Sequence, residues 1–347
     1  MQLLQTLHDL ASHIQIESSV FFVADHNYEL TIPKANVIKQ LQKLSQGIQD
    51  KYLSSLLGHF IYGIYFSGSL VKEKTHVVKT DYNDEFVKIT SEVDWNFYNE
   101  LHKNNKGKGS FFPNCRVLKQ ESNGRLVVQM QDIILNIHRD CHLQLAERSA
   151  TVGDLVAVSM PPSQFKRGYY TAIGDAVFDL STPVALVYFN FTPEGAVALM
   201  EGLTTRLNEI KIPFVFLVFY NPSSYGGYYS GFLRFHKDSY ESVKQVLQTV
   251  YKSNQLHFQS QAPIFTKALA PGVALTEDPE QKFQPFENLG TNRCTIVANA
   301  LLEAHKNGDK SPEARMKYIL QYFDRFRIDL ERPYLNPNSE DIYTPLD

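Results

Sequence analysis

Lys267 lies in the segment FTKALAPG, residues 265–272, where a reactive amine could be positioned. Apolar and aromatic residues precede it and a rigid Pro-Gly turn follows, so the backbone fixes the direction of its side chain. A lysine that is partly desolvated beside other cations has a depressed pKa and can act as a base. A lysine that lays its aliphatic stem over apolar surface gives the same local pattern. Both interpretations of Lys267 stay open from the residues alone.

Arg293 lies in LGTNRC, residues 289–294, which begins a helix. An arginine beside the free N–H groups of a helix N-terminus indicates a pocket for an anion. Arginines also occur near helix starts without any ligand, and that interpretation is the favoured one here.

His138 and His142 lie in the segment HRDCH, which is expected to be a strand with both histidines on the same side. A metal site would need further ligands with supporting geometry, and nothing nearby in the sequence supplies them. Surface or interface histidines are therefore favoured, and no metal or cofactor is expected.

The segment NNKGKGSFF, residues 104–112, combines glycines and lysines that could present backbone N–H groups to a phosphate. It does not match the phosphate-binding loop in which a lysine precedes Ser or Thr after a fixed spacer. A solvated loop is the favoured interpretation.

The stretch YNPSSYGGYYSGFLRF, residues 220–235, carries no charge before Arg234. It is either an aromatic surface for an uncharged or extended peptide or a turn between two buried strands. The candidate peptide-binding residues are Tyr220, Tyr225, Tyr228 and Tyr229.

The first hundred residues are predicted to be mostly helical. Apolar residues at spacings of three and four predict one long helix over residues 34–66, after Pro33. A second helix is predicted over residues 91–105, with Ser91 as its N-cap.

Strands are predicted to dominate the middle of the chain. Residues 116–145 should form two or three strands with Ser-Asn-Gly as the hairpin turn. Thr192 and Pro193 should begin a helix. Further strands are expected at 154–160, 168–177, 183–191 and 212–220, further helices at 239–253, 290–306 and 311–328, and an irregular Gly/Pro segment at 262–280.

These elements predict an α+β fold in which antiparallel-rich sheets pack with helices in two intimately packed halves. The first half, residues 1–150, would hold a helical region and β-hairpins, and residues 151–347 the second α+β half. No low-complexity linker separates them, so one structural unit is expected.

Composition limits the partners and the compartment. Hydrophobic residues make up 43% and charged residues 20% of the chain, and the formal net charge is −3, so neither nucleic acid nor an anionic membrane is expected as a partner. Three widely separated cysteines favour a reducing compartment. The N-terminus lacks the features of a secretory signal, which predicts a cytoplasmic protein or one exported by a signal-less route.

Taken in order, several segments resemble the HopA-type effector family, named after a type III secreted effector of plant-pathogenic bacteria. The resemblance covers roughly residues 50–345. It rests on GYYTAIGDA, VYFNFTPEGAVALMEGLTTRLN, IPFVFLVFYNP, APIFTKALAPGVALTEDP, NLGTNRC with IVANALLEAH, and RPYLNP.

The resemblance implies an α+β fold and, from the family's biosynthetic members, a lyase of lanthipeptide maturation. Such a lyase eliminates phosphate from phosphoserine or phosphothreonine in a precursor peptide, leaving dehydroalanine or dehydrobutyrine. A kinase-like partner would supply the phosphate and a cyclase would use the product. The α-proton needs a base and the leaving phosphate needs cations.

In that function Lys267 would be the base or a phosphate ligand. Arg234 and Arg293 would hold the phosphate, and His138 or His142 would protonate it as it leaves. Active-looking family members usually carry a lysine in the strand before the turn, where this chain has Leu217.

Those members also carry an arginine just after the turn's tyrosine, where this chain has Gly226 or Gly227. The alternative is therefore a catalytically impaired relative that serves as a peptide- or partner-binding scaffold or effector. Convergence of Lys267, Arg234 and Arg293 on one surface would favour catalysis, and their dispersal would favour binding.

Overall fold

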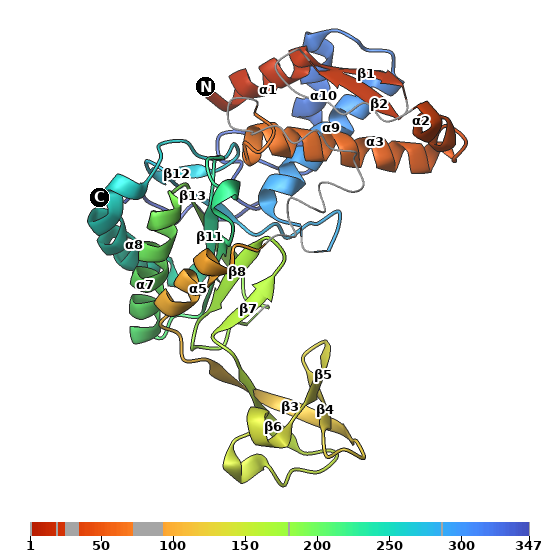
Figure 1. The fold of residues 1–347 in the computed structure, drawn as a ribbon. Coiled ribbons are helices and arrows are strands. Elements are labelled where there is room, and N and C mark those ends of the chain that lie inside the picture. Colours follow the sequence, from red (N-terminus) through yellow and green to blue (C-terminus); the bar gives the residue numbers. More distant parts are fainter. Residues whose placement is uncertain are drawn as a thin grey trace.

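The computed structural model describes residues 2–18, 20–24, 35–71, 93–179, 181–285 and 287–346. Within these ranges helices pack on sheets, and every strand pairing is antiparallel. The predicted α+β fold with antiparallel sheets is confirmed (Figure 1).

The largest sheet has seven strands in the order β12-β13-β9-β11-β10-β8-β7. The prediction of an irregular segment at 262–280 is wrong, because its centre forms the hairpin of β12 and β13. Gly272 makes the turn at a φ of +73°, and β13 is buried between β12 and β9. The strands are β7 (Ser163–Lys166), β8 (Tyr169–Ile173), β9 (Val184–Phe189), β10 (Phe214–Phe219), β11 (Gly231–His236), β12 (Lys267–Ala270) and β13 (Val273–Glu277).

Three helices cover one face of this sheet, which we call the helix-covered face: α5 (Trp95–Asn104), α7 (Pro193–Glu209) and α8 (Tyr240–Asn254). Thr192 caps α7 as predicted, accepting from the backbone of Gly195. Ser91, the predicted cap of α5, lies outside the described residues. Asp94 caps that helix instead and accepts a hydrogen bond from the Phe97 N–H at 3.0 Å.

A second group of helices packs beside the other face, over β9. Its members are α1 (Gln2–His13), α3 (Gln46–Ile61), the π-helical turn η1 (Tyr62–Phe66), α9 (Leu289–Lys306) and α10 (Pro312–Arg325).

Two predictions for this N-terminal region are wrong. The single helix expected over residues 34–66 is broken after α2 (Ala35–Leu41), and Ser45 then precedes α3. A hairpin of β1 (Ile14–Ser18) and β2 (Phe21–Ala24) interrupts what was expected to be helical.

A four-stranded sheet in the order β5-β4-β3-β6 projects from the rest of the molecule, and we call residues 110–160 the β lobe (Figure 1). It has its own buried core, separate from the two cores beside the large sheet. Its strands are β3 (Ser110–Gln120), β4 (Leu126–Met130), β5 (Ile133–Ile137) and β6 (Leu155–Met160).

The predicted Ser-Asn-Gly turn joins β3 to β4, with Gly124 at a φ of +81°. The strand predicted through HRDCH is wrong, because Arg139–His142 form the helical turn α6. Short 3-10 turns complete the described elements: η3 (Leu145–Glu147), η4 (Pro222–Ser224), η5 (Lys237–Ser239) and η6 (Gln255–His257).

None of the helices in the described part of the chain has both the length and the apolar content to cross a bilayer. The division into halves at residue 150 stays a prediction; β3 pairs with β6 across that position.

Candidate functional site

The strand register assigns the predicted cations to opposite faces of the seven-stranded sheet. Directly paired residues of antiparallel strands project their side chains to the same side. Arg234 pairs with Leu186, which also pairs with Thr276. Lys267 pairs with Leu275, whose position alternates with that of Thr276. Lys267 therefore lies on the helix-covered face and Arg234 on the other, so the two do not converge on one phosphate.

Arg234 shares its face with a largely buried aromatic surface on β8, β10 and β11. We call this surface the aromatic face and define it by Tyr169, Val215, Leu217, Phe219, Phe232 and Arg234. The Tyr169 ring stacks on Phe219 with centroids 4.9 Å apart and meets Phe232 edge-on at 5.7 Å. Rings held in this way offer apolar contact area at little entropic cost.

Leu217 lies at the centre of the aromatic face, paired with Thr171 on one side and Phe232 on the other. It is 3% exposed. At the position where the family resemblance implied a lysine, this chain therefore buries an apolar side chain. The resemblance also implied an arginine at Gly226 or Gly227. A Cβ on Gly227 would come within 2.3 Å of the Ser67 carbonyl oxygen, so no side chain fits there. Gly226 has open space but a φ of +94°.

Four tyrosines meet at the buried side of the aromatic face and form what we call the tyrosine cluster: Tyr62, Tyr169, Tyr188 and Tyr229. The Tyr229 hydroxyl lies 3.0 Å from that of Tyr62 and 3.3 Å from that of Tyr169. Burial, reinforced by the neighbouring tyrosines, raises the pKa of Tyr62 and Tyr169 well above 10.0.

Arg234 has unused hydrogen-bonding capacity beside this cluster. Its guanidinium is 3.9 Å from Asp278, which also pairs with Lys282 at 2.7 Å. Among the described residues its buried Nε has no partner, nor do the hydroxyls of Tyr188 and Thr276. Buried polar atoms without partners cost free energy, so these three atoms mark a polar position beneath the aromatic face.

Lys267 lies on β12 and is held by the C-terminal segment. Its Nζ is 2.7 Å from Asp341 and 5.3 Å from the Tyr334 ring centroid. Burial alone would raise the pKa of Asp341, but hydrogen bonds from Lys267 and Tyr334 outweigh it and hold that pKa below 3.8. This arrangement fixes a chain segment and leaves the Lys267 amine engaged.

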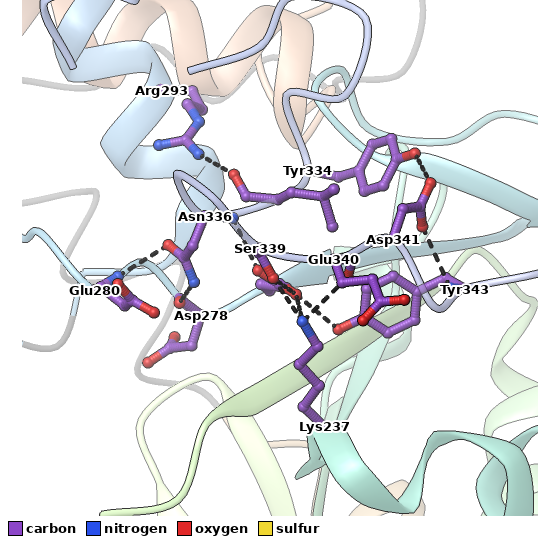
Figure 2. A network of polar contacts seen from close by, with 12 residues as sticks. Lys237, Asp278, Glu280, Arg293, Tyr334, Asn336, Ser339, Glu340, Asp341 and Tyr343 are labelled. Atoms are coloured by element: carbon purple, nitrogen blue, oxygen red, sulfur yellow. Dashed lines mark hydrogen bonds and ion pairs between the residues drawn. The ribbon is translucent and has the colours of Figure 1, made fainter. Parts of the chain in front are cut away.

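Arg293 is 3% exposed and binds the same C-terminal segment (Figure 2). It donates to the carbonyls of Pro333 at 3.1 Å and Leu335 at 2.9 Å, and to Asn292 at 2.8 Å. Burial lowers its pKa to about 10, against the opposing effect of nearby Glu277 and Glu287. A phosphate could reach this guanidinium only by displacing the backbone it holds.

His138 and His142 lie at the helical turn α6 of the β lobe, whereas Lys267 and Arg234 lie on the seven-stranded sheet and Arg293 on α9. His142 Nδ1 accepts from the His138 backbone N–H at 3.0 Å, and the two rings are stacked with centroids 6.2 Å apart. The structure does not bring them together with Lys267, Arg234 or Arg293.

The four predicted peptide-binding tyrosines also separate. Tyr220 and Tyr225 pack on the helix-covered face, where Tyr220 accepts from the Gly168 N–H and Tyr225 donates to the Phe219 carbonyl. Tyr229 belongs to the tyrosine cluster on the other face. Tyr228 donates its backbone N–H to Ser67 at 2.8 Å. They do not line one common groove.

The loop at 104–112 does gather backbone N–H groups around an anion, but the anion is internal. Lys108 and Gly109 donate to the same Asp175 carboxylate oxygen at 2.7 and 3.0 Å. A phosphate would have to compete with this carboxylate, so the favoured interpretation as a non-binding loop fits the geometry.

Sequence reasoning missed a buried carboxylate, Glu277, that organises the C-terminal segment. It is 2% exposed and accepts from Lys237 at 2.8 Å, Ser339 at 2.7 Å and Tyr343 at 3.1 Å. Residues 262–280 were expected to be irregular. The alternation of side chains along a strand, which would have placed Glu277 on the inward face, was therefore not applied to this segment.

A family model described as the HopA1 effector protein family matches residues 160–335, which is half of the chain. The chain belongs to the HopA1 effector protein family. The match spans the seven-stranded sheet from β7 to β13 but leaves out most of the β lobe and the N-terminal helices. No curated protein matches the chain.

Two solved effector structures from Pseudomonas syringae resemble the chain across most of its length. The protein from pathovar syringae strain 61 is 14% identical and covers 88% of this chain and 94% of its own, with a TM-score of 0.45. The protein from pathovar tomato strain DC3000 is 15% identical and covers 86% and 94%, with a TM-score of 0.45.

Proposed function

We propose that this HopA1-family chain binds an extended peptide on the aromatic face and does not catalyse phosphate elimination. One observation carries the proposal: the strand register separates Lys267 from Arg234, while Leu217 occupies the centre of the face that holds Arg234. Elimination needs a base beside the α-proton and cations beside the leaving phosphate. At the centre of this face Leu217 offers no base, Arg234 lies 3.9 Å from Asp278, and Lys166 lies on the edge strand β7 beyond Tyr169.

Peptide binding uses what the aromatic face does offer. The partly buried rings of Tyr169, Phe219 and Phe232 provide apolar contact, and Arg234 adds one charged donor at their edge. Contacts of this kind suit an extended peptide with apolar side chains and a carboxylate or phosphate group. The peptide would be met in the cytoplasm of the producing cell or, for an exported protein, of a host cell.

Elimination remains a second candidate because of the unpartnered polar atoms beside Arg234. The Arg234 Nε and the hydroxyls of Tyr188 and Thr276 are buried, and a phosphate would reach them only if the side chains above them moved apart. This lyase would act on phosphoserine or phosphothreonine of a precursor peptide in lanthipeptide-type maturation. A kinase-like partner would then have to supply the phosphate, and a cyclase could capture the dehydroamino acid.

The test combines mass spectrometry with binding measurements on one set of phosphoserine and phosphothreonine peptides and their unphosphorylated forms. We expect the peptides to stay intact and to bind, and Phe232→Ala to weaken binding about tenfold through lost aromatic contact. Leu256→Ala is the matched control, since Leu256 is 98% exposed on η6.

Loss of phosphoric acid from the peptides would contradict the proposal and establish elimination. Abolition of that loss by Arg234→Ala would assign the reaction to the aromatic face, and abolition by Lys267→Ala alone would assign it to the helix-covered face. Binding unaffected by Phe232→Ala would exclude the aromatic face as the binding surface.

A further inference from the structure

The strand β7 forms one end of the seven-stranded sheet and pairs, within the described residues, with β8 alone. Its residues Gln164, Phe165 and Lys166 are exposed. An exposed edge strand carries unpaired N–H and C=O groups that can pair with another chain.

The register of β7 shows which of its backbone groups face outward. Ile173 donates its N–H to the Pro162 carbonyl at 2.8 Å, so this pair is hydrogen-bonded toward β8. Hydrogen-bonded and non-hydrogen-bonded pairs alternate along an antiparallel ladder. The N–H and C=O groups of Ser163 and Phe165 therefore point to the free edge.

Aromatic side chains flank this edge on the helix-covered face. Trp95, the one tryptophan of the chain, is 59% exposed, and Phe165 is 57% exposed. Their rings stack with centroids 6.4 Å apart, and the Phe165 ring stacks on Tyr220 at 5.6 Å. Large exposed aromatics anchored on buried ones are the residue types that dominate binding interfaces.

Three lysines surround β7, although the carboxylate of Asp175 accepts from the backbone of Lys108 and Gly109 in the same region. Lys166 is exposed within the strand, and Lys106 and Lys108 are exposed in the loop beside its start. The Asn105 side chain places that loop by donating to the Pro162 carbonyl at 2.9 Å. Lys106 has an acidic neighbour, Glu201, at 3.4 Å. The balance favours an acidic partner.

We propose that the free edge of β7 receives an extended acidic peptide as an additional strand, with an apolar side chain of that peptide on the Trp95 and Phe165 rings. The added strand would hydrogen-bond to Ser163 and Phe165. This inference rests on the proposed peptide-binding function and adds a second contact for the peptide, at the sheet edge beside the aromatic face rather than on it. Alternate side chains of the same strand would project toward the aromatic face, since Gln164 and Lys166 pair with Thr171 and Tyr169.

The probe is a fluorescent synthetic octapeptide that alternates phenylalanine with glutamate, tested by anisotropy on the full chain. We expect Phe165→Ala and Trp95→Ala each to weaken binding about tenfold, and Leu256→Ala to leave it unchanged. Two versions of the peptide, N-methylated at odd or at even positions, test the backbone pairing. Only every second N–H group of an added strand faces β7, so one version should lose binding and the other should keep it. Hydrogen exchange should slow at Ser163 and Phe165 when the peptide is bound.

Binding that is lost in Phe232→Ala but unchanged in Phe165→Ala, without slower exchange at β7, would overturn this inference and leave the proposed function standing. Absence of binding by this peptide and by the phosphopeptide set would overturn both. Slower exchange at β7 that depends on protein concentration and needs no peptide would assign the edge to a second copy of the chain, which also overturns the inference.

Discussion

Arg293 shows how a single residue can have the chemistry of a ligand-binding group and serve the fold instead. Its position near the start of α9 was recognisable in the sequence. Its partners were not, because the carbonyl groups of Pro333 and Leu335 come from a segment 40 residues or more away. Every residue has a backbone carbonyl group, so no sequence motif predicts which of these groups accept hydrogen bonds from Arg293.

We predict that Arg293→Met lowers the free energy of unfolding by about 2–3 kcal/mol. The substitution removes the donors to two buried carbonyls of the C-terminal segment and keeps an apolar side chain of similar length. Urea unfolding monitored by circular dichroism measures the loss.

The matched control is Arg332→Met in the same region, since Arg332 pairs with Asp329 at the surface. A surface ion pair of this kind contributes little, so stability should stay nearly unchanged. Equal losses in the two variants would contradict the role assigned to Arg293.

At the scale of elements, the C-terminal segment from Pro333 to Leu346 closes the edge of the large sheet. Arg293 donates to the start of this segment, Glu277 accepts from its middle, and Lys267 pairs with Asp341 near its end. Tyr334, Leu335 and Tyr343 are buried in the core beneath α7 and α8. The segment has no regular secondary structure, so its place depends on these side-chain contacts.

The Lys267–Asp341 pair predicts a loss of stability in acid. The pKa of Asp341 is lower in the folded protein than in the unfolded chain, so its ionisation stabilises the fold above the unfolded pKa. That contribution disappears as the pH falls through the folded pKa. We expect Asp341→Asn to be less stable than the unsubstituted protein at neutral pH and to approach its stability below pH 3.8.

Thermal unfolding of both proteins across this range measures the difference. Asp238→Asn serves as a control with an acidic residue outside the pair. A constant gap between Asp341→Asn and the unsubstituted protein at every pH would show that the pair does not contribute through ionisation.

Strong patterns made most elements predictable. Helices α7, α8, α9 and α10 and strands β6, β8, β9 and β10 lie close to their predicted ranges because each has a clear period, cap or apolar run. Prediction failed where pairing with a distant strand determines the secondary structure. The Gly- and Pro-rich sequence of β12 and β13 becomes a hairpin only because β13 pairs with β9. The separation of Lys267 from Arg234 depends on that register and was therefore inaccessible.

The whole molecule has one region that is joined to the rest by two neighbouring strands. The β lobe begins at Ser110 and ends at Met160, and these two residues pair directly. Paired residues lie about 5 Å apart, a distance that a short linker spans. Its core residues contact one another rather than the two large cores.

We predict that replacing residues 110–160 by a short Gly-Ser linker leaves the remainder folded, with a thermal midpoint close to that of the full chain. Circular dichroism and the peptide-binding assay above both report on the remainder. Loss of cooperative unfolding would show that the lobe stabilises the large sheet. Excising β12 and β13 in the same way is the contrasting variant, because it removes a buried strand of the large sheet together with Glu277, and it should abolish folding.

Ionisation of the tyrosine cluster offers an optical signal for the separation of η1 from the face beneath it. Tyr62 and Tyr169 have pKa values raised above 10.0, so their neutral forms stabilise the fold below that pH and this contribution is lost as the pH rises. In alkali these hydroxyls should resist ionisation until the face beneath η1 separates, and then ionise together. After a pH jump, the absorbance of tyrosinate should rise in a slow phase. This phase should be absent in Tyr229→Phe, because the Tyr229 hydroxyl links Tyr62 to Tyr169. The rate of that phase would time the exposure of the buried edge of the aromatic face, without any added label.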